Sequence, residues 1–196
     1  MDAEATEASQ VMERYCGGEV AAFHRLYVLL SPRILAYLRS LIGERAAAED
    51  LLQVTFLKVH EARSSYVRGA NPIPWIYTIA HRTCLDELRK RKRSRVRLTS
   101  DGELPSTPRA DITGTAEEAQ GAPESPRAGA AMAALQHLPE SQRQALLLTK
   151  VHGRSHAEAA QIAGSTPGAI KLRAHRAYVT LRAILGRKSE EEIDLS

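Results

Sequence analysis

Two groups of basic side chains are the residues of this sequence best suited to bind another molecule. Between Arg82 and Arg97 there are eight Lys and Arg against two acids, and between Pro139 and Lys188 there are nine against two. A partner with dense negative charge, such as duplex DNA, is bound by basic zones of this kind. For either zone taken alone, a solvated basic surface is the simpler alternative.

No pattern typical of covalent chemistry accompanies these basic groups. Cys16 and Cys84 lack a CxxC or HxxC companion and the seven histidines are scattered, so we expect no metal site and no cofactor. The chain has no phosphate-binding loop, paired-carboxylate signature or nucleophile motif. Its first residues lack the apolar core of a signal peptide, and no stretch approaches membrane-spanning length. We therefore expect a reduced cytoplasmic protein that is not an enzyme, has no small-molecule substrate and does not insert into membranes.

The elements that carry the basic groups are expected to be helices. Hydrophobic residues make up 43% of the 196 residues but aromatics only 5%, and no strand-like alternation recurs. Residues 98–129 are rich in Pro, Gly, Ser and Thr, which predicts a flexible linker because such a segment buries too little apolar surface to order. The sequence therefore predicts an all-α fold of two small helical domains, 19–97 and 130–187, with tails at 1–18 and 188–196.

In the first domain, Ser31 and Pro32 predict a break between two helices, and Gly43 ends the second of them. A polar loop is expected at 64–71. The long helix after it begins with two prolines, which cost little in a first turn because their missing N–H groups would lack helical partners there. The four expected helices span residues 19–30, 32–42, 45–62 and 72–92.

In the second domain, the strongest local signal is a helix-turn-helix. Ser155 and Glu158 predict a capping box, Gly164 ends the helix it opens, and Thr166 with Pro167 starts a final helix that reaches residue 185. The second helix of such a pair enters the major groove of DNA. Two shorter helices are expected before it, at 130–137 and 139–152.

A helical wheel of the final helix separates a core face from a face that could read DNA. The expected core residues are Ile170, Ala174, Ala177, Leu181 and Ile184. The candidates for base edges are Gly168, Ala169, Lys171, Leu172, His175 and Arg176. Whether a given cation reads guanine or holds phosphate stays open at this point, and a solvated face is the alternative.

The wheel of helix 72–92 places Trp75 and Ile79 on the same side as Arg82, Asp86 and Arg89. An apolar pair among arginines suits a face that meets nucleobases, since separated bases need a stacking surface. The alternative is that the tryptophan packs under another helix of its own domain. The cluster at 89–97 is expected to hold the DNA backbone, with a frayed helix end as the simpler interpretation.

The wheel of helix 45–62 suggests a protein-docking surface. Val54 and Leu57 lie among Asp50, Gln53 and Lys58, on the side away from the expected core. Apolar side chains among charges on a helix surface are typical of a site that another protein covers. Another helix of the same domain covering them is the alternative.

Three stretches of the sequence resemble the RNA polymerase sigma factors. Residues 48–62 (AEDLLQVTFLKVHEA) resemble their polymerase-binding helix, and residues 74–93 (PWIYTIAHRTCLDELRKRKR) resemble the helix that melts and reads the −10 promoter element. Residues 138–177 resemble their −35-reading domain. With no further domain expected, the resemblance is to the extracytoplasmic-function (ECF) class, which implies a region 2 helical bundle and a region 4 helix-turn-helix.

Together the wheels and this resemblance imply three sets of site residues, with the loop 64–71 capturing a flipped base of the −10 element. Polymerase binding is assigned to Asp50, Gln53, Val54, Phe56 and Leu57. Binding to the −10 element is assigned to Ser64, Ser65, Tyr66, Asn71, Trp75, His81, Arg82, Asp86 and Arg89. Binding to the −35 element is assigned to Thr166, Gly168, Lys171, Leu172, Arg173, His175 and Arg176.

The partners implied by the resemblance are core RNA polymerase, promoter DNA and an anti-sigma factor, with the acidic linker passing through the polymerase cleft. Val54, His60, Leu172 and Ala174 depart from the residues usual in the family, which are glutamate, tryptophan, serine and leucine. One alternative is a helix-turn-helix regulator that works without polymerase, as a dimer on a palindromic site. A second is an enzyme or ligand sensor with a DNA-binding tail, which would need a pocket in the first domain.

Overall fold

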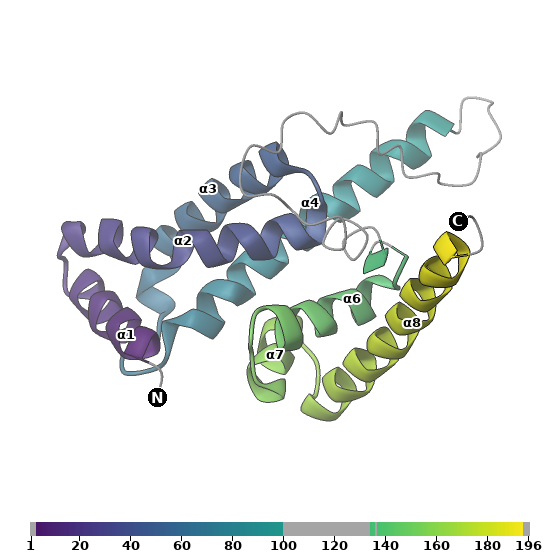
Figure 1. The fold of residues 1–196 in the computed structure, drawn as a ribbon. Coiled ribbons are helices and arrows are strands. Elements are labelled where there is room, and N and C mark those ends of the chain that lie inside the picture. The colour runs from purple at the N-terminus through teal and green to yellow at the C-terminus, as the bar shows by residue number, and fades with distance from the viewer. Residues whose placement is uncertain (1–2, 100–133, 136, 194–196) are drawn as a thin grey trace.

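A computed structural model of the chain describes residues 3–99, 134–135 and 137–193, and their regular elements are all helical (Figure 1). This confirms the all-α prediction. Most of the expected linker, residues 100–129, lies outside the described part of the chain. The first domain contains α1 (Ala3–Cys16), α2 (Val20–Ile42), α3 (Arg45–Glu61), the short 3-10 helix η1 (Ala62–Ser65) and α4 (Pro72–Thr99). The second contains α6 (Glu140–Leu146), the π-helical turn η2 (Leu147–Val151), α7 (His156–Ala163) and α8 (Pro167–Ile193).

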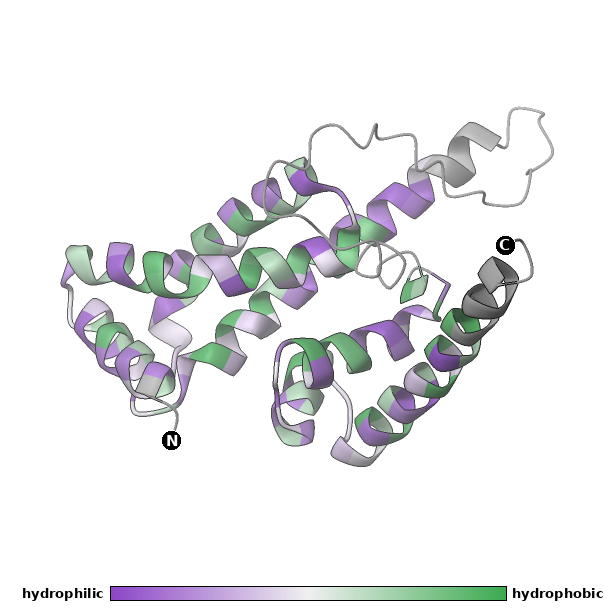
Figure 2. Ribbon diagram, in the orientation of Figure 1, coloured by the Kyte–Doolittle hydropathy of each residue, from purple (hydrophilic) through white to green (hydrophobic). Residues whose placement is uncertain are grey.

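The core of the first domain lies where α2, α3 and α4 meet (Figures 1 and 2). Each helix contributes an apolar stripe at helical spacing, such as Leu26, Leu30 and Ile34 on α2, while its polar residues face outward. On α4 the buried apolar stripe runs from Ile73 to Cys84. Within the described ranges, no helix is both long enough and apolar enough to cross a membrane.

The expected break at Pro32 is absent, because α2 continues through it from Val20 to Ile42. Pro32 is exposed, whereas Leu30 and Ile34 on either side are fully buried. A proline inside a helix removes one hydrogen bond and crowds the preceding turn. Here one continuous apolar face spans both halves of the helix, so the packing of that face outweighs the local signal.

The segment interpreted as an N-terminal tail instead forms α1, which packs against α2 and α4. Ala8 and Met12 are completely buried. The Tyr15 ring lies 5.1 Å from that of Phe23 on α2, and its hydroxyl contacts Nδ1 of His60 on α3. Helix α1 therefore belongs to the core of the first domain.

The helix-turn-helix of the second domain forms as predicted. The Ser155 hydroxyl accepts a hydrogen bond from the Glu158 N–H at 3.2 Å, and the Glu158 carboxylate accepts one from the Ser155 N–H at 2.8 Å. Gly164 ends α7 with φ of 59°, in the left-handed region that favours glycine. Helix α8 then packs on α6 and α7, and continues past the expected end at residue 185 to Ile193.

The two domains are in direct contact, which the sequence did not predict. Helix α7 packs against α4, and η2 packs against α2. The His152 ring, which follows η2, lies 5.2 Å from the Tyr37 ring in an edge-on contact. The Arg154 guanidinium lies over the Tyr77 ring, 5.5 Å from its centre, within the range of a cation–π interaction. The apolar core is continuous across this boundary.

Candidate nucleic-acid interface

The exposed face of α8 is the best-formed candidate for reading DNA. The Thr166 hydroxyl accepts a hydrogen bond from the Ala169 N–H at 3.2 Å and so fixes where the helix begins. Ile170, Ala174 and Ala177 are buried against the domain, as the wheel predicted. The opposite side is open. Of the predicted −35 residues, Arg173 is half-buried and the others are exposed, namely Thr166, Gly168, Lys171, Leu172, His175 and Arg176.

The loop before α4 presents some of its predicted −10 residues and buries another. Ser64, Ser65 and Asn71 are exposed, and the Asn71 side chain accepts a hydrogen bond from the Ile73 N–H at 3.0 Å, so it also stabilises the start of α4. Tyr66 is buried, and its hydroxyl donates to the Ala70 carbonyl. The prediction that the Tyr66 side chain contacts DNA directly is therefore wrong for this arrangement, because the loop folds over that side chain.

Trp75 combines the two predicted alternatives, packing within its own domain and facing outward. It is half-buried against the core of its own domain, and its ring lies 5.4 Å from that of Tyr66. The buried tyrosine therefore supports the tryptophan from one side, while part of the indole remains accessible.

His81 is not available to DNA in this arrangement. Only 2% of its surface is exposed, and its Nδ1 lies 2.7 Å from the Tyr37 hydroxyl. Burial, assisted by the nearby cations Arg82 and Arg89, lowers the His81 pKa to about 4, so the ring is neutral near pH 7. Its assignment as a direct −10 reader is therefore corrected: the side chain joins α4 to α2.

The accessible predicted residues of α4 border two grooves. The first lies between α3 and α4 and is lined by Lys58, Glu61, Ala62, Ile79, Arg82, Thr83 and Asp86. The second lies between α4 and the end of α7 and is lined by His81, Arg82, Leu85, Asp86, Arg89, Ile162, Ala163 and Gly164. The predicted residues Arg82 and Asp86 line both grooves. The assigned set omitted Lys58 and Ile79, although the wheels had placed both on outward faces.

The outward face of α3 is a separate surface. Asp50 and Gln53 are exposed, and Val54 and Leu57 expose 40% and 57% of their surface. Phe56 is only 3% exposed, and its ring packs edge-on against Tyr27 at 4.8 Å. Phe56 therefore makes no direct contact with a partner in this arrangement. Its side chain anchors α3 to α2, which leaves it the role of supporting the outward face.

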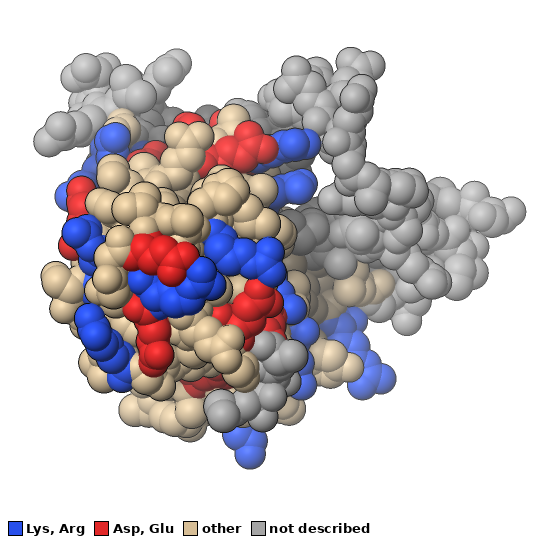
Figure 3. All heavy atoms as spheres, turned by 90° about the vertical axis from the view of Figure 1, so that its left-hand side faces the viewer, with Lys and Arg blue, Asp and Glu red and all other residues tan. Residues whose placement is uncertain are grey.

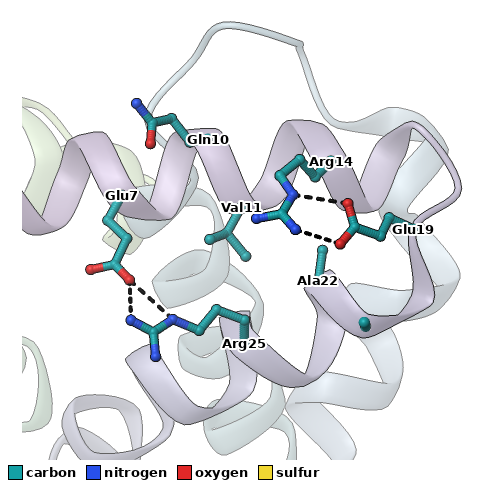
Figure 4. Close-up of a pocket in the computed structure, with 8 residues that line it drawn as sticks. Glu7, Gln10, Val11, Arg14, Glu19, Ala22 and Arg25 are labelled. Carbon is teal, nitrogen blue, oxygen red and sulfur yellow. Dashed lines mark hydrogen bonds and ion pairs between the residues drawn. The ribbon is translucent and has the colours of Figure 1, made fainter.

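The face formed by α1 and the beginning of α2 has mixed charge (Figure 3). Basic and acidic groups pair across it, with Arg14 on Glu19 and Arg25 on Glu7 beside the groove shown in Figure 4. Paired charges cancel at a distance, so this face lacks the positive potential that phosphates require. In the described part of the chain, no group of three or more His, Cys, Asp or Glu could hold a metal ion.

This geometry defines a DNA-binding protein with two helical modules. Residues 26–94 match the family Sigma-70 region 2, and residues 128–181 match Sigma-70, region 4. The RNA polymerase sigma factor CarQ of Myxococcus xanthus is 37% identical over 178 residues, covering 89% of this chain and 95% of the relative. The ECF RNA polymerase sigma factor SigF of Caulobacter vibrioides is 33% identical, covering 90% and 92%. The chain belongs to the ECF class of RNA polymerase sigma factors.

Solved structures show the same fold. The sigma factor RpoE of Bartonella quintana, in complex with the anti-sigma factor NepR, aligns with a TM-score of 0.66 and 29% identity, covering 85% of this chain and 98% of that one. CnrH, in complex with the cytosolic domain of CnrY, aligns with a TM-score of 0.66 at 22% identity, covering 95% and 99%.

Proposed function

We propose that this protein binds core RNA polymerase in the cytoplasm and directs it to promoters through two modules, the first domain formed by α1 to α4 and the second formed by α6 to α8. One observation carries the polymerase half of this proposal. Helix α3 exposes Val54 and Leu57 beside Asp50 and Gln53, although its other side is firmly packed. An exposed mixed apolar and polar face of this kind suits a protein partner.

In this proposal, α8 enters the major groove of the −35 element. The loop 64–71, Trp75 and the groove between α3 and α4 engage the −10 element. Arg82 supplies a cation at that groove, and Trp75 a partly accessible aromatic surface. Capturing unstacked bases offsets the few kcal/mol that unstacking costs, by stacking and polar contact. The protein then needs no covalent chemistry of its own, since the polymerase supplies catalysis.

Docking on one polymerase also explains how two small modules bind a promoter together. A single module of this size makes few DNA contacts, but fixing both modules makes the second contact effectively intramolecular. Because α7 lies against α4, the two domains have to separate before the inner side of α4 can reach DNA.

An anti-sigma factor is the further partner we propose. The structure of the similar RpoE from Bartonella quintana is of a complex with the anti-sigma factor NepR. A relative of this chain at 29% identity therefore has such a partner, and the shared fold supports an equivalent one here.

The test is run-off transcription by core polymerase, with and without this protein, on genomic promoter fragments. We expect defined transcripts only when the protein is present. A polymerase-independent regulator would instead bind a symmetric site as a dimer in gel-shift experiments without polymerase, and would yield no new transcripts. That result would overturn the proposal.

A further inference from the structure

Leu172 is an apolar side chain in the middle of the open, cationic face of α8. It exposes 50% of its surface, and its neighbours Lys171, His175 and Arg176 are exposed too. The packing of α8 on its own domain is carried by the opposite side of the helix, where Ile170 is buried. Leu172 therefore contributes little to the fold, and half of its surface remains available to a ligand.

The position of Leu172 along the helix directs it toward base edges. The Thr166 cap begins the helix, so Leu172 lies in its second turn, within the N-terminal half that meets bases in a recognition helix. Gly168 lies one turn earlier on the same face, and a Cβ built on it would have no heavy atom within 4 Å. That face is open, so the backbone can approach DNA closely and bring Leu172 into the groove.

The chemistry of leucine selects among the groups it could meet there. Leucine neither donates nor accepts hydrogen bonds, and the one apolar group in the major groove is the C5-methyl of thymine. Against any other base edge, leucine would remove water from a donor or acceptor without replacing its hydrogen bond. We propose that Leu172 selects thymine at one position of the −35 element by contact with its methyl group. This inference rests on the proposed role of α8 as the −35 reader.

The test replaces each thymine of a −35 element, on both strands in turn, with deoxyuridine, which lacks only the methyl group. Holoenzyme assembled from core polymerase and the full chain is assayed by run-off transcription and by promoter binding. Burial of one methyl group corresponds to ~0.8 kcal/mol, or about a fourfold change. With the wild-type protein, we expect deoxyuridine at one thymine position to reduce transcription and promoter binding about fourfold. With Leu172→Ala, the same replacement at that position should have no effect.

The matched control is Val179→Ala, which removes another exposed apolar side chain of α8 about two turns further on. This variant should keep the wild-type response to deoxyuridine, a loss of transcription and promoter binding at the same position. Because Leu172 is exposed, its alanine variant should fold, and circular dichroism checks this.

The inference can be overturned in two distinguishable ways. Suppose that altered −35 elements abolish transcription but no single deoxyuridine reduces it, or that Leu172→Ala responds to deoxyuridine as the wild type does. The proposed thymine contact is then wrong, while reading of the −35 element by α8 stands. If transcription ignores the −35 sequence altogether, the role proposed for α8 fails, and the inference fails with it.

Discussion

At the scale of single residues, α3 shows how neighbouring positions divide their tasks. Phe56 and Leu57 are adjacent and both apolar, yet Phe56 is 3% exposed and Leu57 is 57% exposed. Phe56 packs against Tyr27, so it positions the helix, while Leu57 lies on the outward face with Asp50 and Gln53. Substitutions on the packed side of α3 should therefore abolish activity by unfolding the protein. Substitutions on its outward side should abolish activity by removing a contact with polymerase.

Changing the outward face should abolish polymerase binding without unfolding the protein. The double variant Asp50→Arg with Gln53→Ala alters two exposed positions, and exposed substitutions usually shift stability by no more than about 0.5 kcal/mol. We expect co-purification with core polymerase to be lost while the unfolding midpoint in urea stays near the wild-type value. Glu13→Arg, an exposed change from acid to arginine on α1, is the matched control and should still co-purify. Undiminished binding by the double variant would refute the docking assignment.

At the scale of elements, the helix-turn-helix depends on short-range hydrogen bonds at its corners. The capping box at Ser155 fixes the start of α7, Gly164 ends it, and Thr166 fixes the start of α8. These three points set the angle at which α8 projects from the domain. A weakened cap should therefore reduce the stability of the second domain and the precision with which α8 is presented.

Ser155→Ala should destabilise the protein by about 1 kcal/mol, because it leaves an N–H at the start of α7 without its side-chain acceptor. Urea unfolding followed by circular dichroism measures the effect. Ser155→Asp should retain most of the stability, since aspartate is also a good N-cap residue. Ser141→Ala, at an exposed serine of α6, should change little. Equal losses from Ser155→Ala and Ser141→Ala would show that the cap does not stabilise the domain.

At the scale of the whole molecule, two histidines join parts that are distant in sequence. His81 contacts Tyr37 within the first domain, and His152 brings the second domain against Tyr37 and Tyr77. Burial, with Arg154 and Arg33 nearby, lowers the pKa of His152 to about 4, as burial does for His81. Both rings therefore hold the packed arrangement together in their neutral form.

Stability should fall as the pH is lowered through the window between about 6.5 and about 4. In the unfolded chain a histidine has its ordinary pKa of about 6.5, so within this window the unfolded state binds more protons than the folded state. The contribution of these two groups is complete above about pH 6.5 and is lost by about pH 4. Thermal unfolding measured across this range tests the prediction.

The variant His152→Gln should flatten part of this pH dependence, because it removes one of the two buried titrating rings. His24→Gln, at an exposed position on α2, is the control and should leave the dependence unchanged. A midpoint that is independent of pH between 7 and 4.5 in the wild-type protein would contradict the role given to the buried histidines.

The sequence alone determined the features that depend on near neighbours. The all-α class, the capping box at Ser155, the turn at Gly164 and the two faces of α8 follow from helix caps and helical periodicity, which act over a few residues. The outward position of Asp50 and Gln53 followed from the same periodicity. Each of these features is set by local interactions, and packing of the fold does not change it.

Only the tertiary structure decided which surfaces are covered. It buried Phe56, Tyr66 and His81, continued α2 through Pro32, built α1 into the core and packed α7 against α4. A wheel shows that a helix has two usable faces, but what covers each face depends on segments dozens of residues away. Burial of that long-range surface is the larger energy, so it overrides local signals wherever the two disagree.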